Sequence, residues 1–205
     1  MTSPLTIDEF TACGSHQRGH FMLSSGLHSG DYLQCALYLA EPGRAARAGG
    51  LLADALRRAV PEIDLVVSPA MGGLIIGHEV ARALGLPSVF TERADGEMVL
   101  RRGFAVAPGQ KVVVIEDVVT TGKSTREVIA ILEAAGAEVV ALGSLVNRSG
   151  AANPFDPRPY RALLEASFPT WTADECPLCA EGVPIAKPGS RFIAKKVPTS
   201  TPGSF

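Results

Sequence analysis

One stretch, KVVVIEDVVTTGKST at 111–125, constrains the fold of this chain more than any other. Its apolar run from Val112 to Ile115 is hydrophobic on both faces, which is typical of a central strand in a parallel sheet. Glu116 and Asp117 follow at the carboxyl end of that strand, where open α/β sheets bind their ligands. A polar, glycine-containing turn then leads into a helical pattern. The stretch predicts an α/β protein with a ligand site at this strand end.

The turn at 120–125 contains hydroxyl groups, a glycine and successive backbone N–H groups at the start of a helix. Such a turn suits a phosphate dianion. Glu116 and Asp117 would repel a phosphate that touched them, so they are better placed to accept hydrogen bonds from neighbouring sugar hydroxyls. The two features together predict a site for a phosphorylated sugar.

The main rival is a nucleoside triphosphate loop, because Gly122-Lys123-Ser124 matches the end of the pattern G-x-x-x-x-G-K-[ST]. The first glycine of that pattern would fall at position 117, which is Asp117. A carboxylate there would crowd and repel the phosphates, which disfavours an ATPase or GTPase. A strand and polar turn without any ligand is the other alternative, and it leaves two adjacent acids unexplained.

A second anion-binding loop is predicted at 68–73, between a strand-like segment at 64–67 and a helical pattern. Gly72 and Gly73 are consecutive there, which allows the backbone to approach an anion closely. A tight turn into a helix is the alternative explanation for the same glycines.

The acid pair and its flanking residues resemble the signature of the type I phosphoribosyltransferases, which bind 5-phosphoribosyl 1-diphosphate (PRPP). The resemblance implies that Glu116 and Asp117 are catalytic residues at the ribose. It implies a PRPP-binding segment made of Glu116, Asp117, Val118, Val119, Thr120, Thr121, Gly122, Lys123 and Ser124, and a pyrophosphate loop made of Ser68, Pro69, Ala70, Met71, Gly72 and Gly73.

The segment at 19–34 is similar to the small hood of the orotate phosphoribosyltransferase family. It predicts two short strands around a turn at Ser24-Ser25-Gly26. Arg148, at the end of a strand-like segment, corresponds to an arginine that lies against orotate in the family. A guanidinium suits that role because it can stack on the ring and pair with the carboxylate. From the residues alone it could be a solvated charge. The resemblance implies orotate binding by Thr120, Arg148, Tyr32 and Leu33.

The resemblance implies transfer of ribose 5-phosphate from PRPP to orotate, which gives orotidine 5-monophosphate and pyrophosphate in the biosynthesis of UMP. Magnesium would arrive bound to PRPP, with no metal ligands supplied by the protein, and the enzyme would be a homodimer. Another purine or pyrimidine phosphoribosyltransferase, or a PRPP-sensing regulator without catalysis, remains an alternative.

The segment at 91–104 departs from the lysine-rich flexible loops that cover the active site in many relatives, because it contains neither lysine nor histidine. Its cations are Arg93, Arg101 and Arg102, which become the candidates for a lid over the diphosphate. The sequence does not identify which of them would replace the usual lysine.

Composition agrees with a soluble enzyme. The chain has 205 residues, 46% of them hydrophobic and 20% charged, and its net charge of −2 disfavours a nucleic-acid surface. It has no apolar run long enough to cross a membrane and no signal-like N-terminus, so we expect a cytoplasmic location. Cys176 and Cys179 could be reduced thiols, a redox pair or two metal ligands, because a single C-x-x-C supplies only half of a tetrahedral set.

Periodicity predicts a doubly wound, mainly parallel sheet. The expected helices lie at 43–60, 73–84 and 124–135, and the expected strands at 65–68, 88–92, 112–116, 139–146 and 160–166. Gly85 should cap the second helix, and Thr121 or Ser124 the third. We expect one domain at 1–186, including a hood at about 1–40, followed by a flexible tail at 187–205.

Overall fold

The computed structural model describes residues 5–23 and 25–188. These residues form two compact units. The larger contains the residues up to Gln17 together with Leu33–Ser167, and the smaller contains Arg18–Tyr32 and the residues from Phe168 onward. Ser24 of the predicted hairpin turn and residues 189–205 of the predicted tail lie outside the described residues. The domain limits inferred from the sequence stay predictions.

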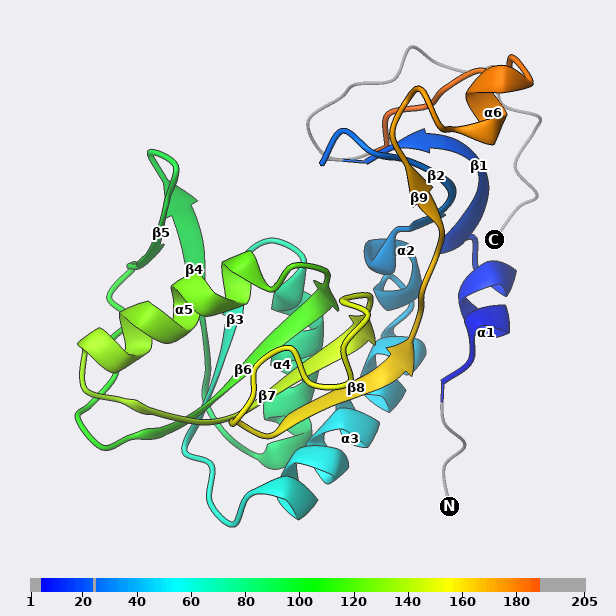
Figure 1. The fold of residues 1–205 in the computed structure, drawn as a ribbon. Helices are drawn as coiled ribbons and strands as arrows, with labels where there is room; N and C mark the ends of the chain where they lie inside the picture. The colour runs from blue at the N-terminus through cyan, green and yellow to red at the C-terminus, as the bar shows by residue number, and fades with distance from the viewer. Residues whose placement is uncertain (1–4, 24, 189–205) are drawn as a thin grey trace. The chain divides into compact units, whose positions relative to one another are not determined.

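The larger unit is built on a six-stranded sheet in the order β5-β4-β3-β6-β7-β8 (Figure 1). Its strands are β3 (Leu65–Pro69), β4 (Ser88–Ala94), β5 (Glu97–Leu100), β6 (Lys111–Val119), β7 (Glu138–Asn147) and β8 (Tyr160–Glu165). Neighbouring strands are parallel except for the pair β4 and β5. The predicted mainly parallel α/β fold is therefore confirmed.

The centre of this sheet is the hydrophobic core, because both faces of its middle strands are covered. Val112 to Ile115 in β6 are fully buried, as the sequence predicted for a central strand. Helix α5 (Lys123–Ala134) packs on one face, while α3 (Pro42–Ala59) and α4 (Gly73–Leu84) cover the other (Figure 1). The short helices α1 (Ile7–Ala12) and α2 (Cys35–Leu39) also belong to this unit.

Local sequence explains the ends of the two long helices. Glu41 caps α3, because its carboxylate accepts hydrogen bonds from the backbone N–H groups of Gly43 and Arg44, both at 2.8 Å. Helix α4 ends at Gly85, which has a left-handed φ of 74° as predicted. Gly49 lets α3 approach α4 closely, since a Cβ atom there would lie 2.6 Å from the backbone of Glu79.

One local prediction was wrong, and one strand was not predicted. The N-cap of α5 is Gly122, with φ of 72°, rather than Thr121 or Ser124. Thr121 contributes only a long contact, with its hydroxyl accepting from the N–H of Lys123 at 3.4 Å. The segment after β4 is not simply a loop, because β5 turns back antiparallel to β4 through Asp95 and Gly96, both with positive φ.

The smaller unit contains a three-stranded sheet in the order β1-β2-β9. Its strands are β1 (His16–Met22), β2 (His28–Leu33) and β9 (Thr170–Trp171), and a short helix, α6 (Pro177–Ala180), follows. The predicted pair of short strands on either side of Ser25 and Gly26 is confirmed by β1 and β2, although β1 begins before the predicted segment. In the described part of the chain, no helix combines the length and apolarity needed to span a membrane.

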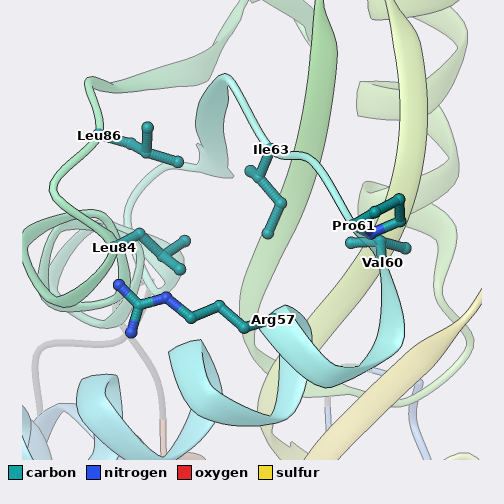
Figure 2. Close-up of a pocket in the computed structure, with 6 residues that line it drawn as sticks. All are labelled: Arg57, Val60, Pro61, Ile63, Leu84 and Leu86. Atoms are coloured by element: carbon teal, nitrogen blue, oxygen red, sulfur yellow. The ribbon is translucent and has the colours of Figure 1, made fainter.

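A pocket of about 330 Å³ lies at the amino ends of β3 and β4, where the sequence predicts no ligand (Figure 2). It is lined by Arg57, Val60, Pro61, Ile63, Leu84 and Leu86. The acid pair lies at the opposite, carboxyl edge of the same sheet. This hollow is therefore distinct from the site described next.

Candidate active site

Glu116 and Asp117 lie in the last part of β6, which continues to Val119 and so extends further than the sequence predicted. Glu116 is 9% exposed, and Asp117 is half-buried. Burial raises the pKa of Glu116 well above its usual range, and the neighbouring charge of Asp117 raises it further. The Asp117 carboxylate accepts a hydrogen bond from the N–H of Val118 at 2.8 Å, which fixes its direction.

The loop after β6 is held by a residue that the sequence did not single out. The Arg126 guanidinium donates to the carbonyl of Thr121 at 2.6 Å and to that of Pro154 at 2.8 Å. Its charge also lies 5.3 Å from the centre of the Phe155 ring. Only glycine has room at position 122, because a Cβ atom there would lie 2.8 Å from the Arg126 guanidinium and 2.9 Å from the Phe155 ring. Arg126, in the first turn of α5, therefore holds the preceding loop in place.

Thr120, Thr121 and Lys123 are exposed, whereas Gly122 is buried. The hydroxyls and the first N–H groups of α5 are thus presented at the sheet edge, as a phosphate site requires. Lys123 is not fixed by a close partner in this loop, and its ammonium lies 4.0 Å from Glu127, one turn further along α5. It can therefore reach a bound anion without breaking a strong ion pair.

The loop at 68–73 lies directly beside the acid pair. A Cβ atom on Gly72 would lie 2.5 Å and 2.6 Å from the two carboxylate oxygens of Asp117. Gly73, the first residue of α4, is equally constrained, because a Cβ atom would lie 2.9 Å from the carbonyl oxygen of Ile115. The N–H of Ala70 donates to the carbonyl of Thr91 at 2.7 Å. Both glycines are thus required for the close approach of this loop to the end of β6.

Arg148 follows the last residue of β7, and its backbone N–H donates to the carbonyl of Val119 at 2.7 Å. Its position is fixed further by Asn147, whose amide oxygen accepts from the N–H of Ser149 at 3.0 Å and whose amide nitrogen donates to the carbonyl of Ala151 at 2.8 Å. The proposed base-contacting arginine therefore emerges at the same sheet edge as the acid pair. Leu33 is buried, and Tyr32 belongs to the smaller unit.

Cys35 lies close to the acid pair and Arg148, although nothing in the sequence indicated this position. Its thiol is buried, and burial raises its pKa well above the usual range. The charge of Asp117 raises it further, while Arg148 acts in the opposite direction. These effects place Cys35 within the electrostatic field of the acid pair and Arg148, in its neutral, unreactive form.

The three arginines of the expected lid lie around the β4–β5 hairpin, and each is paired with a carboxylate. Arg102 donates to both oxygens of Glu92, at 2.8 and 2.9 Å, and Arg101 donates to one of them at 2.5 Å. These bonds lower the pKa of Glu92 to about 2. Arg93 pairs with Glu127 of α5. All three pairs are at least partly exposed, so a bound diphosphate can compete for the arginines.

The arrangement places the two predicted anion-binding loops and Arg148 at the same sheet edge as the carboxylate pair. Such a site can hold a doubly phosphorylated sugar at both ends and place negative charge beside its ring. Within residues 5–23 and 25–188, one group of three or more side chains could hold a metal ion, namely His20, His28, Cys176 and Cys179 of the smaller unit. The acid pair itself does not form such a group.

Comparison with known proteins agrees with this arrangement. The phosphoribosyl transferase domain family matches residues 36–178. An orotate phosphoribosyltransferase from Erythrobacter litoralis is 54% identical over 192 residues, which cover 93% of this chain and 99% of the relative. One from Carboxydothermus hydrogenoformans is also 54% identical, over 173 residues that cover 84% of this chain and 90% of the relative.

Solved structures share the fold at low sequence identity. Orotate phosphoribosyltransferase from Aeropyrum pernix superposes with a TM-score of 0.64 at 23% identity, covering 78% of this chain and 93% of the other. Adenine phosphoribosyltransferase from Thermoanaerobacter pseudethanolicus gives the same TM-score at 19% identity, covering 78% and 100%. The fold is therefore common to enzymes named for different bases.

Proposed function

This chain belongs to the orotate phosphoribosyltransferase family, and we propose that it transfers ribose 5-phosphate from PRPP to orotate. The products would be orotidine 5-monophosphate and pyrophosphate, in the biosynthesis of UMP. The observation that supports this most strongly is the close approach of Gly72 to Asp117, which brings the two loops expected to hold the ends of PRPP together around the acid pair.

The reaction exchanges one bond at the anomeric carbon of the ribose. The bond to the diphosphate oxygen breaks, a bond to a ring nitrogen of orotate forms, and positive charge develops on the ribose between these events. Catalysis of this kind depends on positioning and electrostatics more than on a covalent nucleophile. Asp117 would accept hydrogen bonds from the ribose hydroxyls and lie close to the developing charge.

Glu116 would act beside Asp117, but with a carboxyl group that holds its proton more strongly. Its raised pKa means that it retains a proton to a higher pH than an ordinary carboxyl. A neutral carboxyl can donate to one sugar oxygen while Asp117 accepts from another hydroxyl. Binding of a magnesium-bound substrate or a cationic transition state would favour loss of that proton.

The two loops would hold the ends of the substrate. The 5-phosphate would bind the hydroxyls and N–H groups between Thr120 and Ser124, where Arg126 holds the loop. The diphosphate would bind the backbone of the loop from Ser68 to Gly73. Magnesium would arrive as the PRPP complex, bound through oxygens of the substrate and through water.

Orotate would contact Arg148 and Thr120, with Leu33 and Tyr32 completing its site. Arg148 can pair with the orotate carboxylate and stack on its ring. We further propose a homodimer in the cytoplasm, in which Arg93, Arg101 or Arg102 closes over the diphosphate.

One assay tests the function directly. Purified protein would be incubated with PRPP, magnesium and orotate, and in parallel with uracil, adenine or hypoxanthine. We expect consumption of orotate with stoichiometric release of pyrophosphate, and no turnover of the other bases. Turnover of another base in preference to orotate would assign a different phosphoribosyltransferase, and PRPP binding without turnover of any base would favour the regulator.

A further inference from the structure

Four side chains of the smaller unit converge on one point, although they come from opposite ends of the chain. His20 lies in β1 and His28 begins β2, while Cys176 caps α6 and Cys179 lies within it. One nitrogen or sulfur atom from each lies within 4.8 Å of the corresponding atom of every other member. From this geometry we propose that these four residues form a structural zinc site.

The separations fit a tetrahedral ion. Zinc binds sulfur at about 2.3 Å and imidazole nitrogen at about 2.0–2.1 Å, so neighbouring ligand atoms lie roughly 3.3–3.8 Å apart. The His20 Nε2 atom is 3.0 Å from His28 Nδ1 and 3.5 Å from the sulfur of Cys176. The sulfur of Cys179 lies 3.7 Å from His20 Nε2 and 3.2 Å from His28 Nδ1. These four separations differ from the tetrahedral values by a few tenths of an ångström, and the other two pairs of ligand atoms lie within 4.8 Å of each other.

A hydrogen bond on the far side of the His20 ring selects the tautomer that a zinc ligand needs. Its Nδ1 atom lies 2.7 Å from the carbonyl oxygen of Val183. A carbonyl can only accept a hydrogen bond, so Nδ1 carries the proton and the lone pair of Nε2 faces the cluster. Metal-bound histidines characteristically donate their second N–H to a carbonyl or carboxylate in this way.

The backbone around the cluster already brings the two chain segments together. The N–H of Met22 donates to the carbonyl of Ala186, and the N–H of Ala186 donates to the carbonyl of His20, both at 2.8 Å. His28 is paired with Trp171 in the β2–β9 ladder. The ligands are therefore carried on paired segments, which limits the chain entropy lost when a metal binds.

The interior of the smaller unit otherwise offers little hydrophobic stabilisation. Among its described residues, the buried hydrophobic side chains are those of Phe21 and Cys176. His20, His28 and Ser29 are buried polar residues in the same unit. Units of this size usually need a metal or a disulfide to hold their segments together. Three of the four candidate ligands are buried and Cys179 is exposed, so the ligands occupy the place where a larger protein has an apolar core, which favours a metal.

The donor set identifies the ion and the type of site. Two thiolates and two imidazoles in a tetrahedral arrangement are typical of zinc. Because all four positions are filled by protein side chains, the site is structural, with no open position for a substrate. The sequence alone did not decide the role of the C-x-x-C pair. The two histidines that complete the set lie about 150 residues away, so no local pattern identified them as ligands.

A disulfide between Cys176 and Cys179 is the competing explanation. Both cysteines are free in the structure. A redox pair would also give no role to the two buried histidines whose nitrogen atoms face the sulfurs. Reduced thiols that only hydrogen-bond to the imidazoles are the second competitor, and metal analysis separates all three.

Protein without a histidine tag would be purified from zinc-supplemented medium, and its metal content measured by mass spectrometry. We expect about one zinc per chain. Cys179→Ser and His20→Asn should each reduce this by about tenfold or more. The matched controls Cys13→Ser and His78→Asn, which change residues outside the cluster, should retain the metal.

A second measurement avoids variants that fail to fold. Apoprotein made by chelation of the wild-type protein would be titrated with cobalt(II) under reducing conditions. We expect the absorption of a tetrahedral cobalt ion together with thiolate charge-transfer bands, and restoration of the thermal midpoint lost on chelation. Reduced wild-type protein that holds no zinc and gives no tetrahedral cobalt spectrum would overturn the proposal, as would zinc retained at full occupancy in Cys179→Ser.

Discussion

The backbone of Gly72 lies directly against the Asp117 carboxylate, since a Cβ atom on Gly72 would lie 2.5 Å from one carboxylate oxygen. Gly72 has an ordinary helical φ of −59°, so its conformation does not require glycine. Space is what requires it. The carboxylate cannot rotate away without losing the hydrogen bond from the N–H of Val118.

We therefore expect Gly72→Ala to lower kcat/KM about tenfold or more, because small displacements of catalytic groups have large effects on rate. The free energy of unfolding should change little by comparison. Gly50→Ala is the matched control, because a Cβ atom there meets nothing within 4 Å. Steady-state kinetics and chemical denaturation of both variants make the comparison, and unchanged kinetics for Gly72→Ala would mean that the contact has no part in catalysis.

Asp117→Asn should keep the fold and lower kcat by about a hundredfold, because it removes negative charge beside the cationic ribose while conserving shape. Single-turnover kinetics with saturating PRPP isolates the chemical step. Circular dichroism and the thermal midpoint provide the folding control. Turnover equal to that of the wild type would exclude the electrostatic role of this carboxylate.

Glu116 should make stability depend on pH, because burial and then the charge of Asp117 raise its folded-state pKa above the unfolded value. Such a group favours the folded state least when pH is high, since the unfolded chain ionises first. Glu116→Gln should therefore stabilise the protein more at pH 8 than at pH 5. The stabilisation should grow as the pH rises from 5 to 8, because the unfolded chain loses this proton while the buried carboxyl of the folded protein still retains it.

Urea denaturation of wild type and Glu116→Gln at both pH values measures this difference. Glu138→Gln serves as the control, because Glu138 is exposed at the start of β7. An equal effect of Glu116→Gln at pH 5 and pH 8 would contradict an unfavourable buried charge at this position.

Most of the larger unit could be predicted because its signals are local. The apolar runs of β3, β6 and β7 and the periodicity of α3 and α4 lie within single segments, and a parallel sheet places their carboxyl ends at one edge. The placement of the acid pair and of both loops at this edge followed from that rule, whereas Arg148 was singled out only by the family resemblance. The close contact between Gly72 and Asp117 did not, because it depends on the packing of two loops.

The parts that could not be predicted depend on residues far apart in sequence. Arg126 braces the loop at Thr121 only because Phe155 and Pro154 lie beneath it. β9 is two residues long and pairs with β2 across about 140 residues, and no local pattern identifies such a strand. The proposed zinc site could not be predicted for the same reason. The histidine pair and the cysteine pair are each an incomplete ligand set, and they lie far apart in the sequence.

Arg148→Ala should raise the KM for orotate far more than the KM for PRPP, by about tenfold or more, because a charge-assisted hydrogen bond contributes roughly 1.5–3 kcal/mol. Arg161→Ala is the control, since that exposed arginine of β8 donates to the carbonyl of Tyr160 and lies outside the proposed site. Equal weakening toward both substrates would indicate that Arg148 supports the site without contacting the base.

The three arginines proposed to form a lid are bound to Glu92 and Glu127 in this structure, so the proposed closure over a diphosphate would require them to exchange partners. If the enzyme is a homodimer in which one subunit's hairpin completes the other's site, the two functions can be separated between subunits. One subunit would carry Asp117→Asn, and the other would carry Arg93→Ala, Arg101→Ala and Arg102→Ala.

Each parent dimer should have low activity, because every site lacks either the carboxylate or the cations. In the mixed dimer, one site combines an intact Asp117 with an intact hairpin from its partner, so we expect activity well above that of both parents. Subunit exchange would be verified with two different affinity tags, and activity measured on dimers carrying both. Mixed dimers no more active than their parents would show that the hairpin acts within its own subunit or does not contribute to catalysis, because only transfer across the interface can restore a complete site.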